Sequence, residues 1–264
     1  MPRGGATALN YQSGSVSSEE MIGTITIRSR AYLSTYHLRA AVRLAADSGN
    51  AENVFRGHPA PMRGRPAQEM QDALFEHRGY VTGAILAAVA FLEALINELF
   101  LDVVDYESAE SELAPSAQPT PLHQLPPAGR ERMAKMWPDG IEKLGILRKF
   151  EAALTLTEKQ AFNHGAAPYQ DVPLLITLRN KLVHFQPQWS GGGADRNFEQ
   201  KLERKFSLHP WFEGSPGNPF FPDKCLGHGC AGWAVSTILQ FADAFCSHIG
   251  ITPNYHTFRP TRST

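Results

Sequence analysis

One stretch of about forty residues, from Ala67 to Tyr106, constrains the fold of this chain most strongly. Its apolar side chains recur at helical spacing, which predicts a long helix. The most apolar part, Val81 to Val104, has the length of a membrane span, but charged and amide groups interrupt it: Glu93, Asn97, Glu98 and Asp102. Such groups are costly inside a bilayer, so we expect a buried core helix and no membrane.

Most of the remaining chain also has helical spacing. Further helices are predicted at 32–54, 130–137, 140–154, 172–185, 197–206 and 231–248. The alternation over Ile22–Ile27 gives at most a short extended arm without a strand partner. The sequence therefore predicts an all-α fold, a helical bundle with an extra N-terminal helix.

The predicted helices fall into one domain with long connections. Residues 1–20 are Gly/Ser-rich and predict a disordered tail, and residues 21–264 form a single domain with its core at about 67–248. Loops are expected at 58–66, at 108–127 with five prolines, and at the glycine run 190–193.

Composition excludes several classes of protein. The formal charge of −1 over 264 residues gives no global basic field for nucleic acid, so any such partner is met locally. Three cysteines form no disulfide framework, and the start lacks a secretory apolar segment, which indicates a cytoplasmic protein. A Walker-type phosphate-binding pattern and a Gly-x-Ser-x-Gly turn are absent from the sequence, so NTP hydrolysis and serine esterase chemistry have no support.

The predicted helix 172–185 carries the candidate site. Pro173 lies in its first turn and Pro187 stops it. Arg179 is expected in the middle of an apolar stripe formed by Val172, Leu175, Ile176, Leu182 and Val183. An arginine on such a face needs a partner, because a buried unpaired charge is costly. Beside the stripe runs a polar line of Thr177, Asn180 and His184.

The stretch Arg179-Asn180-Lys181-Leu182-Val183-His184 resembles the Arg-x4-His signature of HEPN domains, which are all-α bundles. Residues Ala87 to Phe100 resemble the long early HEPN helix, which often carries an inward acid, and Glu93 fits that place best. The resemblance covers about 67–185, with insertions. It implies an antiparallel bundle that acts as a metal-independent endoribonuclease without cofactor. It also implies a homodimer, and a toxin–antitoxin or defence partner.

Metal-free RNA cleavage uses the ribose 2′-hydroxyl as the internal nucleophile. His184 would serve as general acid/base and Arg179 as the phosphate ligand, with Asn180 orienting either group and Glu93 holding Arg179. Arg179 and His184 point about 140° apart on one ideal helix, so two copies facing across a two-fold axis would pool these groups in one cleft.

Two other interpretations of these residues stay open. In the first, Arg179 ties the bundle together through Glu93 and His184 caps a helix end. In the second, the chain is a catalytically inactive HEPN-like binding or scaffold module.

Three further groups of residues have alternative interpretations. Cys225, His228 and Cys230, with Cys246 and His248, have zinc-type side chains, although the nearby glycines favour a turn and we expect no metal. The basic segment 201–205 is either a solvated helix face or part of a single-stranded RNA surface. Nearby aromatics either stack on bases or fill the core: Trp211, Phe212, Phe220 and Phe221.

Overall fold

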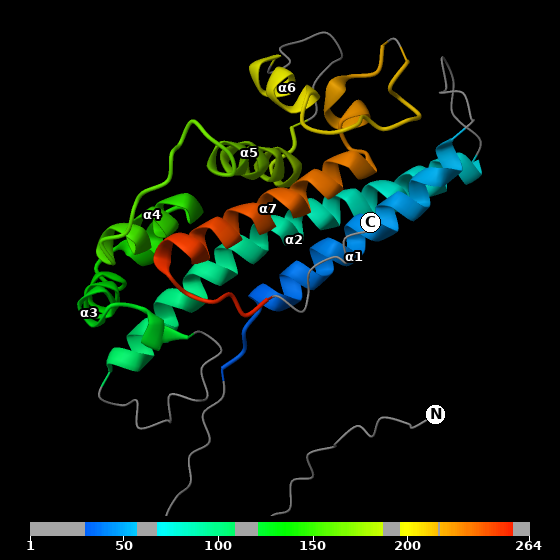
Figure 1. The fold of residues 1–264 in the computed structure, drawn as a ribbon. Helices are drawn as coiled ribbons and strands as arrows, with labels where there is room; N and C mark the ends of the chain where they lie inside the picture. The colour runs from blue at the N-terminus through cyan, green and yellow to red at the C-terminus, as the bar shows by residue number, and fades with distance from the viewer. Residues whose placement is uncertain (1–29, 57–67, 109–120, 187–195, 216, 256–264) are drawn as a thin grey trace, which may run out of the picture. The chain divides into compact units, whose positions relative to one another are not determined.

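A computed structural model describes residues 30–56, 68–108, 121–186, 196–215 and 217–255. Helices make up the regular structure of these ranges, with no strand among them, so the predicted all-α class is confirmed (Figure 1). The chain divides into two compact units, Met1–Ala31 and Tyr32–Thr264, and the described helices all belong to the second. The expected tail 1–20, arm 22–27, break 58–66 and glycine run 190–193 lie outside the described residues.

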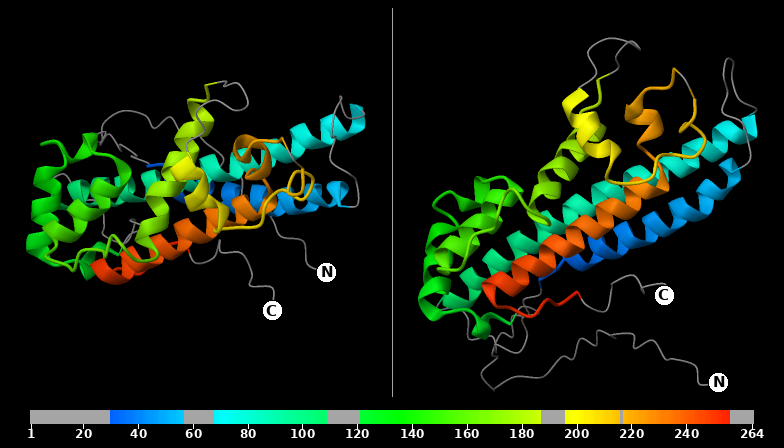
Figure 2. Two further views of the ribbon diagram at one scale, coloured as in Figure 1. Left: turned by 90° about the horizontal axis from the view of Figure 1, so that it is seen from above. Right: turned by 45° about the horizontal axis from the view of Figure 1, so that its top comes forward.

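Helix α2, Gln68–Glu107, is the longest element, and both views of Figure 2 show it running alongside α1 and α7. It packs on α1 (Ser34–Glu52) and α7 (His228–Ile249), and also contacts α3, α4 and α5. By length and composition α2 resembles a membrane span, but half of its most apolar window is buried inside the protein. The prediction of a core helix is therefore confirmed for α2.

Polar side chains of α2 position the start of α1. Glu98 accepts hydrogen bonds from the backbone N–H groups of Leu33 and Ser34, at 2.6 and 2.8 Å, and from the Ser34 hydroxyl. These contacts satisfy donors that the first turn of a helix leaves unpaired. Asp102, fully buried, accepts a hydrogen bond of 2.7 Å from the Tyr32 hydroxyl.

The chain crosses one end of α2 through short helices. After η3 (Leu122–Gln124) come α3 (Pro127–Met136), η4 (Ile141–Lys143) and α4 (Ile146–Leu156). The single helix predicted for 140–154 is thus wrong at its start. Gly140 has φ 134°, and the backbone is extended at Leu144 and Gly145, so a short 3-10 turn and a new helix replace it.

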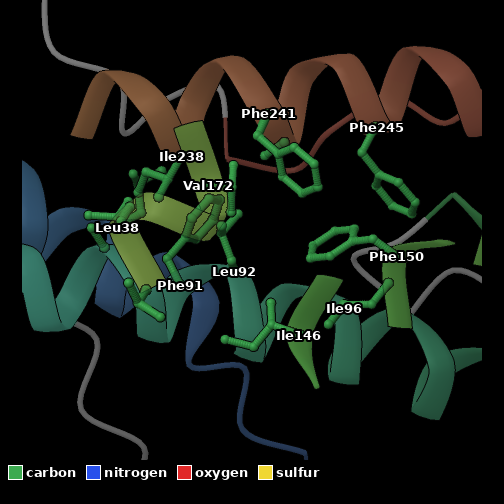
Figure 3. Close-up of a cluster of buried hydrophobic side chains, with 14 of the residues drawn as sticks. Leu38, Phe91, Leu92, Ile96, Ile146, Phe150, Val172, Ile238, Phe241 and Phe245 are labelled. Atoms are coloured by element: carbon green, nitrogen blue, oxygen red, sulfur yellow. The ribbon is translucent and has the colours of Figure 1, made fainter. Parts of the chain in front are cut away.

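The main core gathers where α4 and α7 meet α2. Figure 3 shows Phe150 of α4 beside Phe241 and Phe245 of α7, with ring centroids 4.9 and 4.7 Å away in edge-to-face geometry. Phe150 is fully buried, and burying a side chain of this size contributes about 2–3 kcal/mol. The helices that form this core, α2 and α7, also contact the next helix along the chain, Val172–Val183.

Two helices and a loop complete the fold. The turn η5 (Tyr169–Asp171) leads into α5 (Val172–Val183), and α6 (Arg196–Glu203) packs against α5. A loop and the π-type segment η6 (Phe220–Lys224) then lead to α7.

A second, small core lies apart from the main one. Trp211 and Phe212 are 4% exposed and pack with Phe55, so they fill a core and offer no surface for bases. Phe220 and Phe221 are half-buried against the main core. The core-filling interpretation is therefore confirmed for Trp211 and Phe212, whereas Phe220 and Phe221 pack on the main core with part of each ring exposed.

Candidate functional site

The buried face of α5 differs from the predicted stripe. Val172, Leu175 and Leu178 are fully buried, whereas Ile176 and Leu182 are half-buried and Val183 is 53% exposed. Val172, Leu175 and Leu178 follow one another in three-residue steps on the core side of the helix. The edge formed by Ile176, Arg179 and Val183 is therefore turned away from the core. The prediction that Arg179 lies in the middle of the apolar face is therefore wrong.

Arg179 lies at the half-buried edge of α5, where water reaches it. Glu93, the predicted partner, is exposed on α2. Among the described residues no ion pair or hydrogen bond joins Arg179 to Glu93. Because the guanidinium is partly solvated, its location does not require a carboxylate. Glu93 is not an inward-facing acid, contrary to the resemblance.

Other polar groups of α2 face inward instead. Asn97 accepts a hydrogen bond of 2.8 Å from Nζ of Lys149, which is 5% exposed and lies over the Trp137 ring. Glu98 and Asp102 hold the start of α1. The inward groups of α2 therefore serve α1 and α4, and none of these bonds reaches α5.

His184 ends α5 on its exposed side. Its backbone N–H donates to the carbonyl oxygen of Asn180 at 2.8 Å, and its φ of −104° and ψ of 37° end the helical conformation. The side chains of Asn180 and His184 are exposed, as are those of Val183 and Phe185, at 53% and 51%. The structure thus brings Asn180 and His184 to one solvent-facing end of α5, with Arg179 at its edge and two large apolar side chains beside them.

A groove of about 500 Å³ runs between α5 and α6, one turn before Asn180. Thr177, Lys201 and Lys205 line it, and α6 is held there by Lys181, which lies over the Phe198 ring at 4.9 Å. Lys205 pairs with Asp171 at 2.7 Å, whereas Lys201 is exposed. The groove therefore places an exposed cation beside the polar line of α5.

The cysteine–histidine segment at the start of α7 does not bring its side chains together as metal ligands. Cys225 and Cys230 are buried, and within the described residues neither belongs to a group of side chains with metal-ligand geometry. His228 turns to α1, where Nδ1 lies 3.0 Å from the carbonyl oxygen of Ala45 and 3.2 Å from the hydroxyl of Ser48.

Another group of side chains in the described residues does have metal-ligand geometry. It consists of Glu52, His77 and His209, all buried, from segments far apart in the chain. Sequence spacing gave no sign of it. None of its members belongs to the set of residues predicted to cleave RNA.

Comparisons with protein-family models, with curated proteins and with solved structures found no match to this chain. The function is therefore inferred from the residues and their arrangement.

Proposed function

We propose that this protein is a metal-independent endoribonuclease that acts as a homodimer. The observation that supports it best is the exposed cluster at the end of α5, where Arg179, Asn180 and His184 reach solvent together. Side chains that serve only to hold a bundle have no need of this exposure. A substrate site needs it.

In this proposal His184 transfers the proton of the 2′-hydroxyl or of the leaving oxygen. An imidazole titrates near neutral pH and contributes typically about 10²–10⁴-fold. Arg179 binds the phosphate oxygens and offsets the negative charge that grows on phosphorus. Asn180 orients the phosphate or the imidazole. Glu93 has no part, because it is exposed and shares no bond with Arg179.

The dimer follows from the direction of the side chains and from the surface around them. On an ideal helix Arg179 and His184 point about 140° apart, so one copy presents them poorly to one phosphate. Val183 and Phe185, both more than half exposed, flank His184 and would be covered by a second copy across a two-fold axis. Arg179 of one copy would then face His184 of the other.

The groove between α5 and α6 extends this surface. Lys201 would contact a phosphate next to the cleaved one, an interaction that weakens as salt rises. The protein carries little net charge, so such a local contact has to provide RNA affinity.

The first test is cleavage of single-stranded RNA by purified protein in EDTA. We expect His184→Ala to remove cleavage and Arg179→Ala to reduce it at least about a hundredfold, as loss of a charge-stabilising group does. His123→Ala is the matched control, because His123 is exposed on η3. Cleavage that survives in His184→Ala, or none by the wild type, would support the alternative of a catalytically silent binding module of a defence or toxin–antitoxin system.

A mixing experiment tests the dimer. If one copy supplies Arg179 and the other His184, a mixture of the two inactive variants forms heterodimers with one intact site. Random pairing would restore about a quarter of the wild-type rate. No restoration, with heterodimers shown to form, would contradict a composite site.

A further inference from the structure

Glu52, His77 and His209 converge from three segments that are far apart in the sequence. Glu52 is the last residue of α1, His77 lies in the first third of α2, and His209 follows α6. One carboxylate oxygen and one ring nitrogen from each histidine lie within 4.8 Å of one another. This arrangement uses none of the residues of the proposed RNA site.

The cluster is shielded from solvent. His77 and His209 are fully buried and Glu52 is 8% exposed. The Phe55 ring lies 5.7 Å from His77 and 5.0 Å from His209, and the two imidazoles meet edge to face at 4.7 Å. Electrostatic interactions are strong in such surroundings, and a polar atom without a partner is correspondingly costly.

Two ring nitrogens in this cluster have no hydrogen-bond partner in the described structure: Nδ1 of His77 and Nε2 of His209. Leaving a buried polar group unsatisfied costs about 1–3 kcal/mol, and such groups are rare in native proteins. Nε2 of His77 faces Glu52, so its Nδ1 points away from the carboxylate, and Nε2 of His209 is the unsatisfied atom that indicates a further ligand here.

The carboxylate is held in place for such a role. Oε2 of Glu52 lies 3.2 Å from Nε2 of His77 and accepts the backbone N–H of His228 at 2.6 Å. A Cβ on Gly227 would lie 3.2 Å from Glu52 and 2.9 Å from the His209 backbone, so glycine permits the close approach.

We propose that Glu52, His77 and His209 bind a divalent transition-metal ion of the zinc type. Two imidazoles and one carboxylate are a ligand set that such ions take, with the remaining position open to water. The ion would occupy the unpartnered nitrogen of His209 and balance the Glu52 charge. It would also join α1, α2 and the segment before α7 at one point.

The protonation of His209 bears on this site. The backbone N–H of Trp211 lies 3.1 Å from Nδ1 and donates to it, so the metal-free ring carries its proton on Nε2. Binding at Nε2 moves that proton to Nδ1, and the Trp211 contact is exchanged for the metal bond.

The test uses the full-length protein, freed of metal by a chelator, and Co²⁺ and Zn²⁺ as probes. We expect one Co²⁺ per chain, with the visible absorption of nitrogen and oxygen ligands and without the near-ultraviolet band of thiolate ligation. Zn²⁺ should displace it and raise the melting temperature. His209→Gln should weaken Co²⁺ binding at least about tenfold, and His123→Gln, at an exposed histidine elsewhere, should leave it unchanged.

Glu52→Gln is the second variant, because it keeps the shape of the side chain and an acceptor for the His228 N–H while removing the charge. Circular dichroism of the metal-free variants reports whether each is folded. If His209→Gln does not fold, the Co²⁺ absorption spectrum of the wild type decides the test. The proposal is overturned if the wild type binds no Co²⁺, if a thiolate band appears, or if folded His209→Gln or Glu52→Gln binds as the wild type does. RNA cleavage in EDTA is a separate readout, so either proposal can fail alone.

Discussion

Nζ of Lys149 donates a hydrogen bond of 2.8 Å to Oδ1 of Asn97, which joins α4 to the C-terminal half of α2. Lys149 is 5% exposed, so its ammonium depends on this amide and on the Trp137 ring 5.3 Å away. The contact lies at the level of the main core, where α4 packs on α2 and α7.

The two ends of this contact should differ in what their loss costs. Asn97→Leu leaves a buried ammonium without its acceptor and should lower the free energy of unfolding by about 3 kcal/mol. Lys149→Met removes the charge and leaves an unpaired amide, which should cost about 1–2 kcal/mol. Urea unfolding at neutral pH measures both. If Lys149→Met proves the more harmful, the amide does not hold the ammonium.

Glu98 should matter more to stability than any surface acid of α2. Glu98→Ala removes the acceptor of two backbone N–H groups at the start of α1, and we expect a loss of about 1–2 kcal/mol. Glu98→Gln keeps one acceptor and should lose less. Glu93→Ala, an exposed position on the same helix, is the control and should stay within about 0.5 kcal/mol of the wild type. A loss at Glu93 equal to that at Glu98 would contradict the cap.

The positions of the helices could be predicted from periodicity, because an apolar face of helical period is buried against a core in any fold. The predicted 67–106 helix is α2, and the predicted 231–248 helix is α7, a few residues longer at its start. The orientation of a helix is harder to predict. Helix α5 has two apolar stripes, and the one through Leu178 packs on the core. Arg179 therefore lies at the edge of the buried face.

Contacts between residues far apart in the chain could not be predicted from the sequence. Glu93 and Glu98 are both acids on one helix, and only the position of α1 decides that Glu98 faces a neighbour. Similarly, Glu52 and His209 are 157 residues apart, so no local spacing indicates that they meet. Asn180 and His184, by contrast, are close in sequence, and their common exposure follows from helical geometry.

Two glycines of α7 offer a matched pair. A Cβ on Gly229 would lie 2.5 Å from the carbonyl oxygen of Ser207, whereas a Cβ on Gly232 would meet nothing within 4 Å. Gly229→Ala should therefore force the Ser207 segment away and cost about 2 kcal/mol or more. Gly232→Ala should be neutral or stabilise by up to about 1 kcal/mol, because alanine favours the helix. Thermal unfolding of the two variants decides, and equal melting temperatures would contradict the close approach.

Tyr169 should give the protein an alkaline limit. Burial is the main cause that raises its pKa to about 12, and the hydrogen bond of its hydroxyl to Glu151 with the charge of that carboxylate adds to it. A tyrosine in the unfolded chain ionises near pH 10, so between about pH 10 and 12 the unfolded state loses the proton first. The stability contributed by the protonated phenol is thus present below pH 10 and lost as the pH rises through this window.

Urea unfolding on either side of pH 10 tests this effect. The wild type should lose more stability than Tyr169→Phe, which has no proton to lose at this position. Glu151→Gln should fall between them, because it removes the opposing charge but leaves the ring buried. Tyr36→Phe, at a ring that is 67% exposed, controls for the loss of a phenol elsewhere and should follow the wild type. Parallel alkaline profiles for Tyr169→Phe and the wild type would show that burial and Glu151 do not hold this proton.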